Sequence, residues 1–195
     1  LNCKNGKCPT GGLNIWPAWS APTPFLGDGV AIGYIEEDWC LDTIADGDVV
    51  QAECSTHEDL QSLYSNHISY LTSSRVPSGG LNFNYWHGTA VLGIMAADHN
   101  NFGTSGIAPN ADYYIGQAWN TSEWITLVQK IIEDGRGDGA MFMVIPLGCF
   151  NSGGLATCPA EVHPEIMQFV RTLTANNFVV VTIPGNSLTN LDNPG

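Results

Sequence analysis

The composition of this chain excludes several classes of protein. Its 195 residues carry a net charge of −13 with only six lysines and arginines, so nucleic acid and anionic membrane surfaces are excluded as partners. Hydrophobic residues make up 44% and charged residues 13%, which indicates a folded globule. No apolar run approaches the roughly 18–20 residues that span a bilayer. One domain of ordinary size is expected.

The amino-terminal part of the chain divides into an arm and the start of a sheet. Residues 1–28 are rich in Gly, Pro, Asn and Trp, and we predict an irregular, disulfide-stapled arm, followed by one domain over residues 29–195. The continuous apolar run at 29–35 predicts a strand covered on both faces. Three acids at 36–38 follow it, at the carboxyl end of the strand, where open α/β sheets place their sites.

The stretch 87–109 is the most informative in the sequence. It opens on His87, and the eight residues 90–97 contain no polar side chain. A run that is apolar on every face predicts a helix buried on all sides, with His87 in its first turn. A histidine held rigidly at the start of a buried helix is well placed to act as a general base. The alternative is a structural histidine that is held by local hydrogen bonds. The preceding residues 40–86 are polar, with one short helix expected near 57–63.

Strands and helices alternate through the rest of the chain. Strands are predicted at 112–116, 141–147 and 178–183, and helices at 122–134 and 164–175. Such alternation indicates βαβ units, and therefore an α/β fold with a doubly wound, mostly parallel sheet and helices on both faces.

Six cysteines fall into three pairs that are close in sequence. Of the 15 connectivities, we favour the local one, Cys3–Cys8, Cys40–Cys54 and Cys149–Cys158. A zinc site is the competing interpretation, but neither a CxxC nor an HxxxH spacing occurs. Disulfides predict an oxidising compartment, and the glycosylation sequon at Asn120 fits secretion. The first residue, Leu1, with no methionine and no signal-peptide pattern, leads us to expect a processed mature protein.

Four separated motifs resemble those of the subtilisin-like serine proteases, or subtilases, in order and spacing over about residues 27–190. They are GVAIGYIE at 29–36, HGTAVLG at 87–93 with GIAP at 106–109, VIPLG at 144–148, and VVTIPGN at 180–186. In the family these motifs carry the triad aspartate, the triad histidine, the substrate-binding strand and the oxyanion asparagine. The resemblance implies a subtilisin-like fold that is incomplete in this chain.

The resemblance assigns a role to each motif. His87 would be the base of a Ser-His-acid triad, and Asn186 would donate its amide to the oxyanion. The aligned acid is Glu36, one methylene longer than aspartate, and Asp38 is a second candidate two residues on. Substrate would bind along Pro146, Leu147 and Gly148.

The expected nucleophile is absent from the sequence. Ser105 lies in a tempting GTS, but it follows His87 by 18 residues and would sit at the far end of the helix, on the order of 15 Å away. The residues around Ser187 do not resemble the sharp turn that presents a nucleophilic serine. We therefore expect the serine on a second chain, cut from the same precursor (a zymogen).

The implied function is a secreted serine endopeptidase subunit that hydrolyses peptide bonds in peptide or protein substrates through a Ser-His-Glu triad. A catalytically inactive subtilase-like scaffold, used as a binding or toxin-associated module, is the alternative. It is favoured by Glu36, by Ala90 where the family often has histidine, and by Pro146 in place of the usual serine.

No cofactor is expected. The loop carboxylates Asp42, Asp46 and Asp48 lack EF-hand-like spacing, so we predict a solvated acidic face, with structural calcium as the alternative. The remaining histidines lie in polar contexts and are expected at the surface: His57, His67, His99 and His163.

Overall fold

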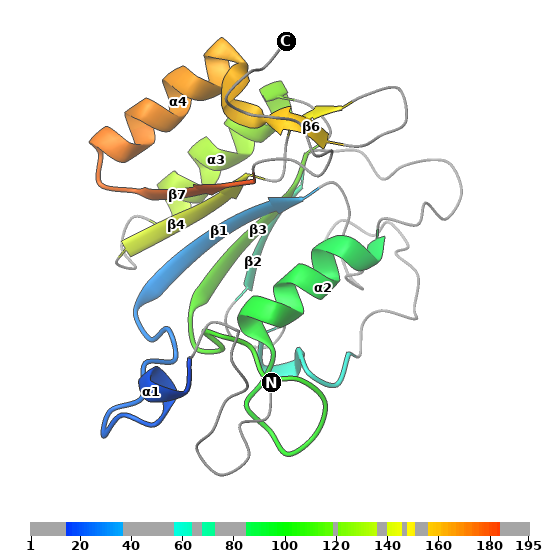
Figure 1. Ribbon diagram of the computed structural model, residues 1–195, viewed down its shortest axis with the longest axis vertical. Helices are drawn as coiled ribbons and strands as arrows, with labels where there is room; N and C mark the ends of the chain where they lie inside the picture. Colours follow the sequence, from blue (N-terminus) through cyan, green and yellow to red (C-terminus); the bar gives the residue numbers. More distant parts are fainter. Residues whose placement is uncertain are drawn as a thin grey trace.

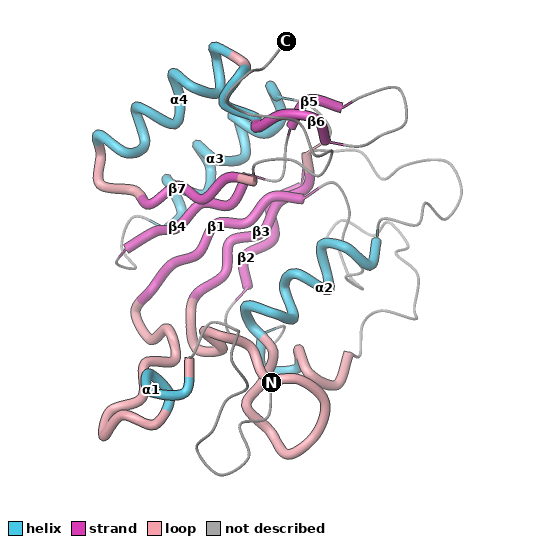
Figure 2. Tube along the Cα trace, in the orientation of Figure 1, coloured by secondary structure: helices cyan, strands magenta, loops and turns pink. Residues whose placement is uncertain are grey.

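A computed structural model of the chain shows an α/β architecture (Figures 1 and 2). It describes residues 15–36, 57–63, 68–72, 85–118, 121–135, 140–145, 148–150 and 156–183.

Five parallel strands form the central sheet, in the order β2-β3-β1-β4-β7 (Figure 1). Their bounds are β1 Val30–Glu36, β2 Ile68–Thr72, β3 Asp112–Gln117, β4 Ala140–Ile145 and β7 Val179–Thr182. Strand β1 lies in the middle and pairs on both sides, with Glu36 opposite Gln117 and Val30 opposite Ala140. The predicted doubly wound parallel sheet is confirmed.

One face of the sheet is covered by two amphipathic helices, α3 (Thr121–Gly135) and α4 (Pro164–Ala175). The periodic apolar residues of α3 are buried against the sheet, and its Trp124 meets Phe169 of α4 edge-on at 5.7 Å between ring centroids. Pro164 pre-sets the first turn of α4, and Asn177, in the left-handed region at φ 66°, follows its end. Both helices match their predicted positions closely.

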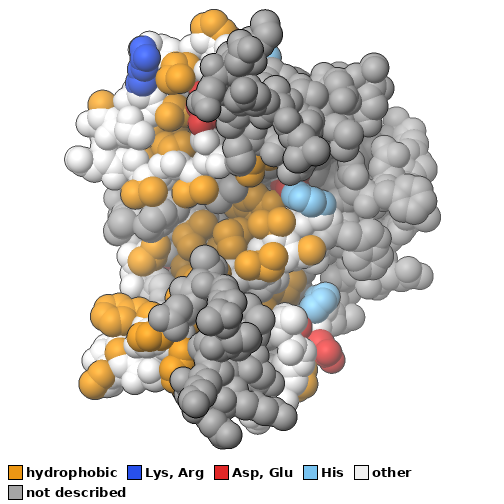
Figure 3. All heavy atoms as spheres, in the orientation of Figure 1, with side chains coloured by type: hydrophobic (Ala, Val, Ile, Leu, Met, Phe, Trp, Pro, Cys, Tyr) orange, Lys and Arg blue, Asp and Glu red, His pale blue; other side chains and the backbone are white. Residues whose placement is uncertain are grey.

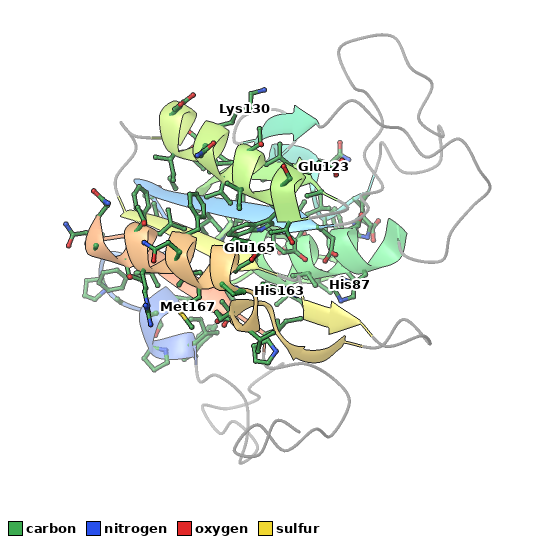
Figure 4. The ribbon with its side chains drawn as sticks, turned by 90° about the horizontal axis from the view of Figure 1, so that it is seen from above. His87, Glu123, Lys130, His163, Glu165 and Met167 are labelled. Carbon is green, nitrogen blue, oxygen red and sulfur yellow. The ribbon has the colours of Figure 1, made fainter. Side chains whose placement is uncertain are left out.

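Helix α2 (Tyr85–Ala96) covers the opposite face of the sheet. Figure 4 labels His87 on this helix and shows β1 between α2 and α3. Leu92 and Ala96 of α2 pack against Tyr34 and Tyr113 of the sheet. The prediction of a helix buried on all sides is wrong, because Ile94 remains 62% exposed. A helix lying on one sheet buries only the side that faces it, and periodicity alone does not reveal what covers the outer side.

Several elements were not predicted. The edge strand β2 lies within the polar region 40–86, and a short antiparallel hairpin joins β5 (Gly148–Phe150) to β6 (Ala156–Pro159). A three-residue 3-10 helix, η3 (Ala160–Val162), follows the hairpin. At 57–63, a turn leads into a helical segment beginning at Gln61, near the predicted short helix.

The described part of the arm packs against the loop that follows α2. It contains one four-residue helix, α1 (Trp16–Trp19), whose Trp19 Nε1 donates to the carbonyl of Ile107 at 3.1 Å. The carboxyl-terminal end of the arm contacts the same loop, because the Nδ2 amide of Asn110 donates to Asp28 Oδ1 at 3.1 Å. The boundary at residue 28 stays a prediction. Within the described ranges, no helix has the length and apolarity to cross a membrane.

Candidate active site

Glu36 and His87, 51 residues apart in sequence, meet at one edge of the sheet. Glu36 is the last residue of β1, and His87 is the third residue of α2. The carboxyl ends of parallel strands share an edge, and Figure 1 shows the amino-terminal end of α2 beside the arrowhead of β1. The imidazole Nδ1 lies 2.7 Å from Glu36 Oε2. The distance is that of a charge-assisted hydrogen bond.

The two partners differ sharply in their exposure to solvent. The Glu36 side chain is 8% exposed, whereas the His87 side chain is 66% exposed. An ionised carboxylate only accepts hydrogen bonds, so Nδ1 of His87 is the donor and carries the proton in this pair. The neutral ring then has its acceptor, Nε2, on the opposite edge, available to take a proton from a reacting group.

Tyr34 is the third residue of this site. It lies two residues before Glu36 on β1, and its hydroxyl donates to the same Oε2 atom at 2.7 Å. The tyrosine is fully buried, and burial together with the neighbouring Glu36 charge raises the pKa of its hydroxyl far above the ordinary value. The hydroxyl therefore remains a donor throughout the working pH range. The sequence pattern predicts Tyr34 only as one residue of an apolar strand. Its two-residue spacing from Glu36, which puts both side chains on one face, is the signal that identifies it as a candidate partner.

The carboxyl-terminal end of α2 is tied to the loop that follows it. Gly106 N donates to Ala97 O at 2.8 Å, and Ala108 N donates to Met95 O at 2.8 Å. A Cβ on Gly106 would come within 2.3 Å of Ala97 N, so only glycine fits. These bonds place Ser105 next to the end of α2 remote from His87, about 15 Å along the helix at 1.5 Å per residue.

A buried carboxylate fastens the same loop to the segment 57–63. Asp59 is 3% exposed, and its Oδ2 accepts from both the backbone N–H and the hydroxyl of Thr104, at 2.9 and 3.0 Å. Gly103, at φ +62°, leaves the room that this carboxylate occupies. Within the described ranges, no cluster of three or more His, Cys, Asp or Glu side chains could hold a metal ion. The loop acids considered for calcium, Asp42, Asp46 and Asp48, lie outside those ranges.

Other predicted site residues also fall outside the described residues. They are the alternative acid Asp38, the oxyanion residue Asn186, the substrate residues Pro146 and Leu147, the glycosylation residue Asn120, Ser187, His67, and Cys3, Cys8, Cys40 and Cys54. Gly148 is the first residue of β5. Of the other histidines, His57 and His99 are exposed as predicted, and His163 is half-buried.

The β5–β6 hairpin brings the last two cysteines together. Cys149 and Cys158 lie directly opposite each other in its antiparallel register. Directly opposed residues have Cα atoms about 4.5–5.5 Å apart, within the range that a disulfide requires. The pairing of these two cysteines remains a prediction, with this register in its support.

The fold and the geometry at its edge define an α/β protein with an acid–histidine pair suited to general acid–base chemistry. The sequence profile of the subtilase family matches residues 39–195, most of the chain, and the chain belongs to that family. Glu36 precedes the matched region, so its role is not carried by the match.

The chain is similar to parts of two known proteins. It is 39% identical over 72 residues to the minor extracellular protease Epr of Bacillus subtilis (strain 168), a match over 36% of this chain and 10% of Epr. Among solved structures, the prenylagaramide maturation protease PagA aligns with a TM-score of 0.49 and 16% identity, over 86% of this chain and 49% of that one. The chain thus spans about a tenth of one relative and about half of the other.

Proposed function

We propose that Glu36 and His87 form the acid–base pair of a subtilisin-like serine endopeptidase whose nucleophilic serine lies outside residues 1–195. The observation that carries the proposal is the 2.7 Å contact between His87 Nδ1 and Glu36 Oε2, in which the His87 side chain is 66% exposed. A buried carboxylate fixes the tautomer, and an exposed Nε2 is what an incoming serine hydroxyl requires.

The chemistry follows from the proton positions. His87 Nε2 takes the serine proton as the serine oxygen bonds to the scissile carbonyl carbon, and Glu36 stabilises the imidazolium that results. The imidazolium then gives this proton to the leaving amine as the C–N bond breaks. Water hydrolyses the acyl-enzyme by the same route in reverse. Asn186 would donate its side-chain amide to the oxyanion in both halves, and extended peptide would bind beside Gly148.

An uncovered apolar surface supports the idea that more polypeptide docks on the α2 face. Val179 and Val181 of β7 point away from α3 and α4, opposite in alternation to Val180, and are 45% and 47% exposed. With Ile94, they leave hydrophobic side chains exposed on the face that carries His87. Figure 3 shows hydrophobic surface on this side of the molecule. A helix headed by the serine, from a second chain of the same precursor, fits this surface.

Labelling with a serine-directed fluorophosphonate tests the proposal. We expect one labelled serine in the intact protein, and peptide mapping should locate it outside residues 1–195. A label on Ser105 would overturn the assignment of the nucleophile. Absence of labelling would favour the inactive scaffold, an alternative supported by Glu36 in place of the family's triad aspartate.

Mass spectrometry of the purified protein under denaturing, reducing conditions tests the two-chain arrangement. We expect this chain and a second component. One component with this chain's mass, or one longer chain containing it, would contradict that arrangement.

The assignment of the acid is tested separately. Glu36→Gln should lower kcat by about 10³–10⁴-fold, because glutamine would leave His87 in the wrong tautomer. The control Asp38→Asn, two residues on, should change kcat by less than about threefold if Glu36 is the acid, because His87 then keeps its partner. The reverse order of effects would make Asp38 the acid.

Secretion is also a proposal. It is supported by the favoured cysteine pairing, by the opposed Cys149 and Cys158, and by the extracellular description of the relative Epr. A mass increase of two hydrogens per disulfide upon reduction, six in total for three disulfides, would support it. Free thiols in the native protein would contradict it.

A further inference from the structure

Glu36 Oε2 is the meeting point of two donors. His87 Nδ1 and the Tyr34 hydroxyl each lie 2.7 Å from this oxygen. Tyr34 is fully buried, and its ring packs in the cluster that supports α2. The phenol therefore reaches the carboxylate from within the core, whereas the imidazole reaches it from the exposed side.

We infer that Tyr34 is a positioning residue, which holds the Glu36 carboxylate in place for His87. The inference rests on the proposed function of the Glu36–His87 pair and extends it by one residue. It assigns to the phenol a role exerted through Glu36, without contact to substrate.

The length of glutamate explains why such a residue is needed. Glutamate has one more rotatable bond than aspartate, so its carboxylate has more positions available and more side-chain entropy to lose when it is fixed. A hydrogen bond from a rigid, buried phenol restricts these positions. Tyr34 is well placed for this because residues two apart on a strand share one face, and Tyr34 and Glu36 belong to the central strand.

The direction of the hydrogen bond follows from the same chemistry. An ionised Glu36 has only acceptors, so the phenol must donate. The pKa of Tyr34 is raised by burial and by the Glu36 charge, which keeps the proton on the hydroxyl. A permanent donor on Oε2 also keeps part of the carboxylate's hydrogen-bonding capacity satisfied when the histidine ring moves.

Tyr113 provides a matched control. It is a second fully buried tyrosine in the same cluster, on the neighbouring strand β3, and its hydroxyl donates to the backbone carbonyl of Ala108 at 2.9 Å. Tyr34→Phe and Tyr113→Phe therefore each remove one buried hydroxyl from the same core. Only the first removes a contact to Glu36.

The test that needs no activity is an NMR spectrum of the intact protein labelled with ¹⁵N-histidine. We expect a downfield Nδ1 proton signal for His87 in the unmodified protein and in Tyr113→Phe, and its broadening or loss in Tyr34→Phe. Indistinguishable signals in the two variants would make Tyr34 an ordinary core residue and overturn the inference.

A double-mutant cycle on hydrolysis adds the functional readout. Tyr34→Phe should lower kcat about 10-fold or more with KM within about twofold, since a hydrogen bond to a charged group is the interaction lost. In the Glu36→Gln background the same change should have less than about a twofold effect on kcat. Equal effects in both backgrounds would contradict action through Glu36. If no hydrolysis is found at all, the proposed function fails, and the NMR comparison alone still decides the role of Tyr34.

Discussion

The two faces of the sheet are built differently. The face under α3 and α4 is closed, because two amphipathic helices bury a continuous cluster that includes Trp124, Ile131 and Ile166. The α2 face is covered by one helix of the described part, and it leaves Ile94 and the outer valines of β7 exposed. The polar pair Glu36–His87 lies on this second face.

The difference separates the stability of the fold from the chemistry that we propose. Buried apolar area stabilises the first face, at about 25 cal/mol per Å². The second face holds a buried carboxylate and an exposed imidazole, and it leaves hydrophobic side chains exposed. Variants on the two faces should therefore separate stability from activity.

The largest effect is expected from His87→Ala on the α2 face. It should lower kcat by on the order of 10⁴-fold or more, because the base is lost, while the exposed ring contributes little to folding. Thermal unfolding and hydrolysis of a peptide substrate by the intact protein measure the two quantities. Unchanged turnover would remove His87 from the mechanism.

On the closed face, Trp124→Ala should reverse this pattern. Removal of a fully buried indole should lower the free energy of unfolding by about 3–5 kcal/mol. Activity per folded molecule should be retained. Gln129→Ala, at an exposed position of the same helix, is the control and should be within about 0.5 kcal/mol of the unmodified protein. Denaturant titration followed by circular dichroism measures the free energy of unfolding of both variants. A loss of activity in the folded fraction of Trp124→Ala would contradict the separation of stability from activity between the two faces.

A smaller effect is expected from Val181→Ser on β7. If further polypeptide covers this face, the intact protein should lose about 1–2 kcal/mol of unfolding free energy, because the valine is then buried. Val162→Ser in η3 is the control, since Val162 is similarly exposed at 53%, and it should be nearly neutral. Equal, negligible changes in both variants would show that the α2 face stays open.

The smallest effect concerns alkaline pH. The pKa values of Tyr34 and Tyr113 are raised by burial, so both remain protonated in the folded state while they ionise near pH 10 in the unfolded state. The stability linked to them is therefore fully present below about pH 10 and falls above it, by up to about 1.4 kcal/mol per pH unit for each tyrosine. Urea titrations at pH 9, 10 and 11 should show a shallower loss for Tyr113→Phe. Identical slopes would contradict the prediction.

Sequence patterns predicted the regular elements well, because periodicity reports which side of an element is buried. The helix predicted at 164–175 is observed at those residues, and the strand predicted at 29–35 from its continuous apolar run is observed as Val30–Glu36. The hairpin strands β5 and β6, of three and four residues, are too short to show a period, and the sequence pattern does not predict them. Strand β7 is equally short, but it lies in a continuous apolar run that predicts it. The exposure of Ile94 could not be predicted either, since it depends on which elements lie above α2.

The candidate site was accessible from sequence only in part. The juxtaposition of Glu36 and His87 depends on the order of strands in the sheet, which motif resemblance supplied and local pattern did not. The phenol of Tyr34 is hidden in an apolar run, because a tyrosine there is equally consistent with simple packing. Its contact with Glu36 requires the three-dimensional direction of both side chains.

The position of α2 has a consequence for the winding of the chain. The connections β2–α2–β3, β3–α3–β4 and β4–α4–β7 all step in the same direction across the sheet, yet α2 lies on one face and the other two helices on the opposite face. Crossovers of equal hand that step the same way place their helices on one face, so the crossover through α2 has the opposite hand from the other two. About 98% of parallel crossovers are right-handed, which makes the α2 crossover the exception. With the usual hand, the whole sheet would separate His87 from the carboxylate of Glu36.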